Sequence, residues 1–133
     1  MTAQPPSIPA IMADAQWLAH RYDPGHDAFH MLPVSRARHA AVPFLTDEHL
    51  ANAGAPQVVR RADAFAHAAQ PAPIHFLFHS AYCCSTLLAA ALDIPGVSIG
   101  LKEPVLLNDL VGWRHRGGKG PDVARVLDMA LRL

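Results

Sequence analysis

The run Ile-His-Phe-Leu-Phe-His at residues 74–79 is almost continuously apolar and has the length of one strand. Such a run is typical of a buried parallel strand, because a strand that is covered on both faces does not alternate between apolar and polar residues. It is followed by the short segment 80–84 and by the helical sequence 85–93. The order of strand, tight turn and helix therefore predicts the start of an α/β core.

A second short strand is expected at residues 97–101, after an Ile-Pro-Gly turn. Strand, helix and strand make a parallel βαβ unit, whose crossover is right-handed in nearly all proteins. Because two strands do not form a buried parallel sheet, we interpret this core as incomplete, to be completed by more chain or by another chain, and a homo-oligomer is one way to do so. Further helices are expected over 105–113 and from Pro121 onward.

The N-terminal half of the chain has a different character. Residues 1–70 predict a mostly helical segment, which prolines separate from residues 71–133, and both segments are expected to belong to one larger domain. A helix is expected over 9–22, because four side chains there fall on one helical face: Ile11, Ala15, Leu18 and Tyr22.

Shorter elements are expected between residues 28 and 70. Residues 28–34 predict a short strand or an extended segment. Ser35 and Thr46 are expected to cap two short helices, because their hydroxyl groups can accept hydrogen bonds from free backbone N–H groups. Residues 56–70 predict an extended piece followed by a helix.

Charge and cysteine content narrow the function classes. The 133 residues include 11 Lys or Arg and 11 Asp or Glu, so the formal net charge is zero. Without a positive field, neither nucleic acid nor an anionic membrane is an expected partner. No apolar run approaches the roughly 18 residues that span a bilayer, and no signal peptide is recognisable. The adjacent Cys83 and Cys84 are interpreted as reduced thiols, so we expect a cytoplasmic protein.

The turn from His79 to Thr86 has the same eight-residue span as the phosphate loop Gly-x-x-x-x-Gly-Lys-Ser/Thr. Only Thr86 agrees with that pattern, because His79 replaces the first glycine, Cys84 the second and Ser85 the lysine. The position still suits an anion, since a turn from a strand into a helix directs free N–H groups to one spot. The hydroxyl groups of Ser85 and Thr86 can donate to a phosphate or sulfate oxygen.

Residues 73–110 resemble the sulfotransferase branch of the P-loop superfamily. Members of that family carry a strand, a loop of the type Lys/Arg-Ser-Gly-Ser/Thr-Ser/Thr, a helix that begins with Leu-Leu-Ala, and often Lys-Glu-Pro after the next strand. The family's two hydroxyl residues fall on Ser85 and Thr86, its serine and glycine on Cys83 and Cys84, and its basic residue on Tyr82. The resemblance implies an incomplete P-loop-type core.

The same resemblance implies a cofactor and a reaction. The loop would hold the phosphosulfate group of 3′-phosphoadenosine 5′-phosphosulfate (PAPS), and the sulfuryl group would pass to a hydroxyl group of a small-molecule acceptor. Glu103 would be the base on that hydroxyl, and Lys102 would stabilise the developing charge. The candidate cofactor-binding residues are His79, Ser80, Tyr82, Cys83, Cys84, Ser85 and Thr86. No metal is expected, because the histidines include no H-E-x-x-H arrangement.

Other interpretations of these residues stay open. Ser85 and Thr86 suit the ordinary capping of a helix, and Lys102 with Glu103 suits a surface ion pair at a strand end. Two other functions fit the same pattern. One is a nucleotide-dependent phosphotransferase with Mg²⁺ at Thr86. The other is a non-catalytic scaffold or interaction module with an altered loop.

Overall fold

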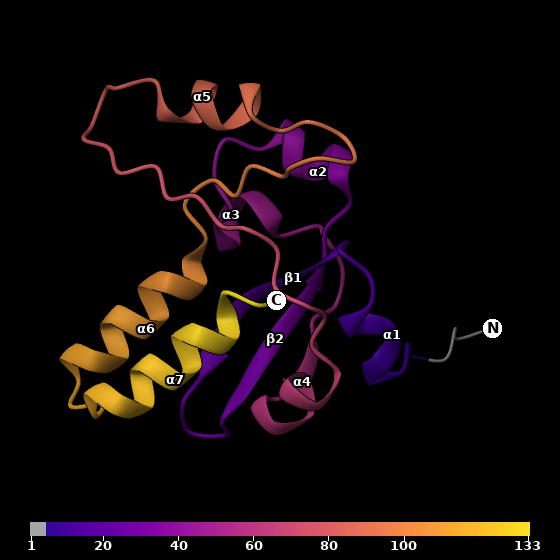
Figure 1. Cartoon of the computed structure of the whole chain (residues 1–133), viewed down its shortest axis with the longest axis vertical. Coiled ribbons are helices and arrows are strands. Elements are labelled where there is room, and N and C mark those ends of the chain that lie inside the picture. Colours follow the sequence, from indigo (N-terminus) through magenta and orange to yellow (C-terminus); the bar gives the residue numbers. More distant parts are fainter. Residues whose placement is uncertain (1–4) are drawn as a thin grey trace.

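The structure, a computed structural model, describes residues 5–133 as a mixed α/β fold around one small antiparallel sheet (Figure 1). The strands are β1 (Trp17–Asp23), β2 (Ala28–Pro33) and β3 (Gln57–Arg60). The helices are α1 (Ile8–Met12), α2 (Arg36–Ala41), α3 (Asp47–Leu50), α4 (Arg61–His67), α5 (Ser85–Ala91), α6 (Val105–His115) and α7 (Gly120–Ala130). The α/β class is therefore confirmed, whereas the sheet that forms is antiparallel and lies in the N-terminal half.

The sheet has the order β1-β2-β3, and both pairings are antiparallel. β1 and β2 form a hairpin, and the end of that hairpin is held by the carboxylate of Asp27. This carboxylate accepts hydrogen bonds from Tyr22 Oη at 2.6 Å and from Arg61 Nε and Nη2 at 2.7 and 2.8 Å. The bonds to Arg61 lower the pKa of Asp27 and join the hairpin to the start of α4.

A β-bulge in β1 decides which side chains reach the core. The register shifts between Ala19 and Arg21, so that His20 has no partner on β2. The extra residue places Ala19 and Tyr22 on one face although they are three positions apart. His20 Nε2 instead hydrogen-bonds Asp47 of α3 at 2.7 Å.

Two apolar clusters cover the sheet. The main core packs one face of the sheet against α1, α4, α6 and α7. Its buried residues come from both sides of residue 70, so the chain is not divided into two cores at that position. These residues are Ile11, Ala19, Tyr22, Phe29, Met31, Val59, Ala64, Leu106, Leu110, Val126 and Met129. α6 and α7 lie side by side within it (Figure 1). The second cluster joins β1 and β2 to the α2–α3 region: Leu18, Leu32, Val34, Val42, Leu45 and Leu50.

Asp109 of α6 attaches the helical hairpin α6–α7 to the free edge of β1. Its carboxylate accepts hydrogen bonds from Arg21 Nε at 2.7 Å, from Arg21 Nη2 at 2.8 Å and from the backbone N–H of Tyr22 at 3.1 Å. The Tyr22 N–H lies on the edge of the sheet, where an open donor would otherwise invite another strand. The side chain of Asp109 is only 15% exposed, so these bonds are shielded from solvent.

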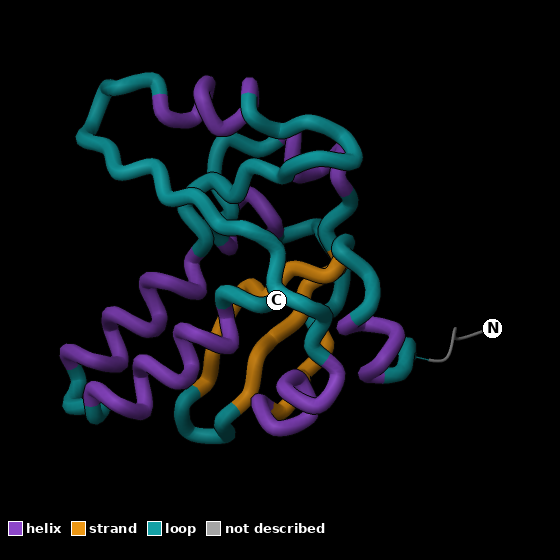
Figure 2. Tube along the Cα trace, viewed as in Figure 1, coloured by secondary structure: helices purple, strands orange, loops and turns teal. Residues whose placement is uncertain are grey.

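Residues 71–101 are called the arm from here on, and the rest of the described chain, which holds both apolar clusters, is called the body. The arm differs from the body in its packing. Only Ala89 is buried in the whole arm, and apart from α5 the arm is loop and turn (Figure 2). The strands predicted at 74–79 and 97–101 are not formed. A strand is held by hydrogen bonds to a neighbouring strand, and none lies beside either segment among the described residues.

The helix predicted over 9–22 is wrong beyond residue 12, because Trp17–Asp23 is β1. Leu18 and Tyr22 are four apart, as on a helical face, but the bulge places them in different apolar clusters. The mostly helical description of residues 1–70 is also wrong for the described residues, because this segment holds all three strands. Residues 1–4 lie outside the described structure.

The other helix predictions are confirmed with small shifts in their ends. Ser35 caps α2, where its Oγ accepts from the N–H of Arg38 at 3.3 Å. Thr46 precedes α3 as expected, but its hydroxyl bonds His49 Nδ1 at 2.7 Å and caps no backbone group. In residues 5–133, no helix combines the length and the apolar composition that crossing a membrane requires.

We predict that Asp109→Ala lowers the free energy of unfolding by about 2–3 kcal/mol, because it removes charge-assisted bonds and leaves an edge N–H without a partner. Chemical denaturation monitored by circular dichroism measures this loss. Asp128→Ala is the matched control, because Asp128 pairs with Arg132 along α7 and is 65% exposed. The control should cost less than about 0.5 kcal/mol. Equal losses in the two variants would contradict the role of Asp109.

Candidate functional site

The candidate loop, residues 79–86, lies in the exposed arm and leads directly into α5. Its backbone is unusual, because Tyr82 and Cys84 have φ values of 60° and 59°. Left-handed backbone is rare outside glycine and costs roughly 1–2 kcal/mol per residue. The position of Cys84 is the one that the family resemblance gives to glycine, so the loop keeps a glycine-like backbone without the glycine.

Cys84 is the residue before α5, and it is followed by the right-handed residues of the helix. Adjoining residues of opposite hand aim successive N–H groups at one concave spot, and such nests bind anions. No side chain caps α5 at this end. Ser85 and Thr86 are half-buried, whereas Ser80, Tyr82 and Cys83 are exposed. The loop thus presents free backbone donors and two hydroxyl groups in one short stretch.

Glu103 is the predicted base that the structure brings to this loop. Its Oε1 lies 3.7 Å from His79 Nε2, and its side chain is 53% exposed. Glu103 also has a left-handed backbone, with φ of 49°. The contact joins the first residue of the loop to the Lys-Glu-Pro segment, 24 positions later in the chain.

Lys102 is placed differently. Its side chain is buried, with 7% exposure, and its ammonium group donates to the carbonyl oxygens of Val42 at 2.5 Å and Ala40 at 3.5 Å. These carbonyls lie at the C-terminal end of α2, where a cation is favourable. In this structure Lys102 therefore fastens the end of the arm to α2, and its charge is directed to the helix end.

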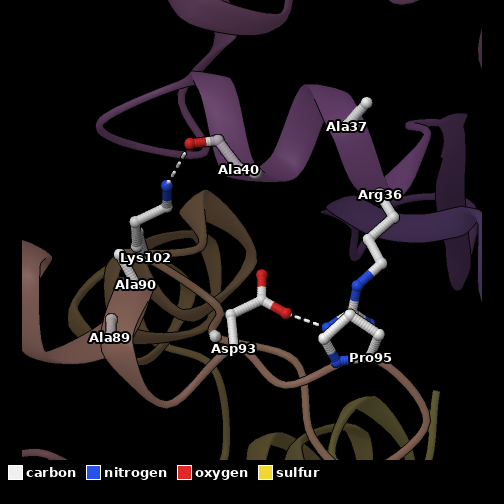
Figure 3. Close-up of a pocket in the computed structure, with 9 residues that line it drawn as sticks. Arg36, Ala37, Ala40, Ala89, Ala90, Asp93, Pro95 and Lys102 are labelled. Atoms are coloured by element: carbon white, nitrogen blue, oxygen red, sulfur yellow. Dashed lines mark hydrogen bonds and ion pairs between the residues drawn. The ribbon is translucent and has the colours of Figure 1, made fainter.

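The cavity beside Lys102 lies between α2 and α5 and has a volume of about 360 Å³ (Figure 3). Alanine side chains from both helices form its apolar walls. Across it Arg36 of α2 and Asp93 of the arm point toward one another and form an ion pair (Figure 3). Arg36 also donates to the carbonyl of Ser98 at 2.9 Å. This is a second attachment of the arm to the body.

Gly100 lets the arm fold back over α5 at this cavity. A Cβ atom at this position would lie 2.4 Å from the carbonyl oxygen of Ala89, closer than any side chain permits. The close approach of the two backbones therefore requires glycine at position 100.

His39 belongs to α2 and is almost fully buried, at 2% exposure. Burial lowers its pKa, the nearby positive charges of Lys102 and Arg36 lower it further, and Asp93 opposes them. Its Nδ1 has no hydrogen-bond partner in the described structure. His39 is therefore a neutral residue of the body.

No protein-family model, curated protein or solved structure matches this chain. The interpretation of the site therefore depends on the residues and their geometry. No group of three or more His, Cys, Asp or Glu side chains in residues 5–133 is arranged to hold a metal ion.

The structure thus assembles part of the candidate site. His79 and Glu103 meet beside a loop whose hydroxyl residues begin a helix, while Lys102 points elsewhere. Neither this contact nor the ion pair of Arg36 with Asp93 could be predicted from the sequence, because neither pair has a characteristic spacing.

We predict that Cys84→Gly raises the free energy of unfolding by about 0.5–1 kcal/mol. Glycine removes the cost of the left-handed backbone, and its own greater entropy in the unfolded chain offsets part of this gain. Denaturant titration measures the change. Cys83→Gly is the control, because Cys83 has no positive φ and gains nothing from glycine. A destabilised Cys84→Gly protein would contradict the left-handed assignment.

We predict that His39 makes the protein acid-sensitive. An unfolded imidazole titrates near pH 6.5, and the folded pKa is lower, so the unfolded state binds more protons as the pH falls below about 6.5. Stability should therefore fall with decreasing pH by up to about 1.4 kcal/mol per pH unit from this residue. His39→Gln should flatten the profile between pH 6.5 and 5, and His67→Gln, at an exposed position, should not. Identical profiles would refute this assignment.

Proposed function

We propose that residues 79–86 and Glu103 bind the phosphosulfate group of PAPS and transfer its sulfuryl group to a hydroxyl acceptor. The observation that supports this most is the left-handed backbone at Tyr82, Cys84 and Glu103. Asp27 is the only other non-glycine residue with positive φ among the described residues. Strain of this kind collects at functional sites. Here it coincides with the two segments that resemble the sulfotransferase motifs.

In the proposed reaction the acceptor oxygen attacks sulfur, and the bond between sulfur and the 5′-phosphate oxygen breaks. The products are the sulfated acceptor and 3′-phosphoadenosine 5′-phosphate. Glu103 accepts the proton of the acceptor hydroxyl, and its 53% exposure leaves it open to an incoming molecule. His79 lies close enough to orient that carboxylate.

Lys102 takes a positioning role in this proposal. Its ammonium is bound to the end of α2, and its backbone carbonyl accepts from the N–H of Leu45 at 2.9 Å. Both bonds hold Lys102 in place, and because Lys102 precedes Glu103 in the chain, they also restrict the position of the proposed base. A direct contact of Lys102 with the sulfuryl group would require it to leave the carbonyl of Val42.

The proposal keeps the chain order of a P-loop core. Residues 74–79 lead into the loop, α5 follows it, and residues 97–101 return beside α5. A parallel pairing of 74–79 with 97–101 belongs to the proposal, and we expect bound nucleotide to favour it. An increase of strand signal in the circular dichroism spectrum on binding would support this part.

We predict that 3′-phosphoadenosine 5′-phosphate raises the thermal midpoint of the protein. Ligand at a hundred times its dissociation constant stabilises the folded state by about 2.7 kcal/mol, which a thermal melt detects. The double variant Ser85→Ala/Thr86→Ala should lose most of this shift. Ser7→Ala is the matched control, because Ser7 precedes α1 without a side-chain capping bond.

The same melts separate the alternatives. A shift with ATP–Mg²⁺ but not with the bisphosphate would favour the phosphotransferase, and no shift with either would contradict the proposed site. For catalysis, Glu103→Gln should retain the bisphosphate shift and abolish transfer from PAPS to a hydroxyl acceptor. Glu48→Gln is the control, because Glu48 is the other glutamate of the chain and is exposed.

A further inference from the structure

We propose that the arm is an interface through which two copies of this chain pair, with residues 74–79 of one copy antiparallel to residues 74–79 of the other. This inference goes beyond the proposed function and does not depend on it. It rests on the exposed apolar side chains of the arm, on its unpaired backbone and on its near absence of charge.

The exposed apolar side chains of the protein are concentrated in the arm. Of the sixteen large apolar side chains that are exposed in the described structure, twelve belong to residues 74–101. Phe78 is 94% exposed, Val97 79% and Leu87 70%. Single exposed apolar residues are ordinary, but such a concentration in one segment is typical of an interaction surface.

The exposed area is large enough for a stable dimer. With roughly 150 Å² for a large side chain, twelve side chains that are about half exposed or more present on the order of 1,000 Å². A stable protein interface needs about 800 Å² from each partner. The largest apolar patch on an ordinary monomer is about 300–600 Å². The exposed apolar area of the whole arm is therefore of the size that one partner contributes to a dimer interface.

The backbone of the arm offers a strand edge. Residues 69–83 form no backbone hydrogen bond with another described residue. The apolar run 74–79 within this segment thus has free N–H and C=O groups on both sides. Such a segment is a template for strand addition by another chain.

The lack of charge selects a second copy as the partner. Residues 71–101 contain no Lys or Arg, so nothing draws the arm to an anionic membrane. Asp93 is the only acidic residue of the arm, and Arg36 of the same chain neutralises it. In a symmetric dimer, a charged residue near the two-fold axis lies close to the same residue of the other copy, and the two like charges repel. A surface without charge avoids this repulsion and is therefore suited to pairing with itself.

The side chains suggest one register. Phe76 and Phe78 lie on the same side of the segment, with ring centroids 6.2 Å apart. If Phe76 of one copy faces Phe76 of the other, Ile74 of each copy faces Phe78 of its partner. One face of the two-stranded ribbon is then entirely apolar, and aromatic pairs across strands are favourable. The two-fold axis passes through Phe76.

The test introduces charge at this axis. Sedimentation velocity over a range of concentrations should show a monomer–dimer equilibrium for the native chain. Phe76→Asp should weaken the dimer more than tenfold, because two carboxylates would face each other. Phe65→Asp is the control, since Phe65 is 69% exposed on α4, outside the arm. Circular dichroism confirms that both variants keep their fold.

A mixing experiment adds a result that loss of folding cannot produce. Phe76→Asp and Phe76→Lys should each be monomeric, and an equimolar mixture should form a heterodimer through the opposite charges. A native chain that stays monomeric at every concentration would overturn the proposal. Assembly beyond a dimer, equal weakening by Phe65→Asp, or no heterodimer in the mixture would also overturn it.

Discussion

One carboxylate connects the two halves of this protein. Asp109 binds both the guanidinium of Arg21 and the edge N–H of Tyr22, so that α6 closes the free side of β1. With that edge closed, the apolar faces of α6 and α7 complete the main core. Residues 102–104 connect the arm to α6, so the position of α6 restricts where they lie. The candidate base, Glu103, therefore lies between two attachments, that of Lys102 to α2 and that of Asp109 to β1.

The body and the arm differ in what holds them. The body is held by two apolar clusters and by buried or half-buried ion pairs. The arm is held by its attachments to α2, through Lys102 and through the pair of Arg36 with Asp93. Between these points its apolar side chains face solvent. Both proposed activities, anion binding and pairing of two copies, lie in this loosely held part, where functional segments are common.

The sequence predicted those elements that depend on local signals. The helices after Ser35 and near Pro121 were predictable from their caps and apolar spacing. Strands were predicted only in part. The extended segments expected at 28–34 and from residue 56 correspond to β2 and β3. The segment 74–79 needs a neighbour that no local pattern guarantees, and in β1 the four-residue spacing of Leu18 and Tyr22 resembles a helical face although the bulge at His20 places them in different clusters. At the candidate site, the start of α5 at Ser85 was predictable from the local sequence. The direction of Lys102 and the contact of His79 with Glu103 were not, since both depend on how the arm folds back.

Hydrogen exchange followed by mass spectrometry, on dilute monomeric protein without ligand, tests whether a stable body carries an arm in which residues 74–83 have no backbone partner within the chain. Amides of β1, β2 and α6 should exchange slowly, because they open only when the body unfolds. Amides of residues 74–83 should exchange at nearly the rate of an unfolded chain, because they have no backbone partner. Slow exchange at 74–79 in the monomer would contradict the account, since it would mean that this segment is paired within the chain.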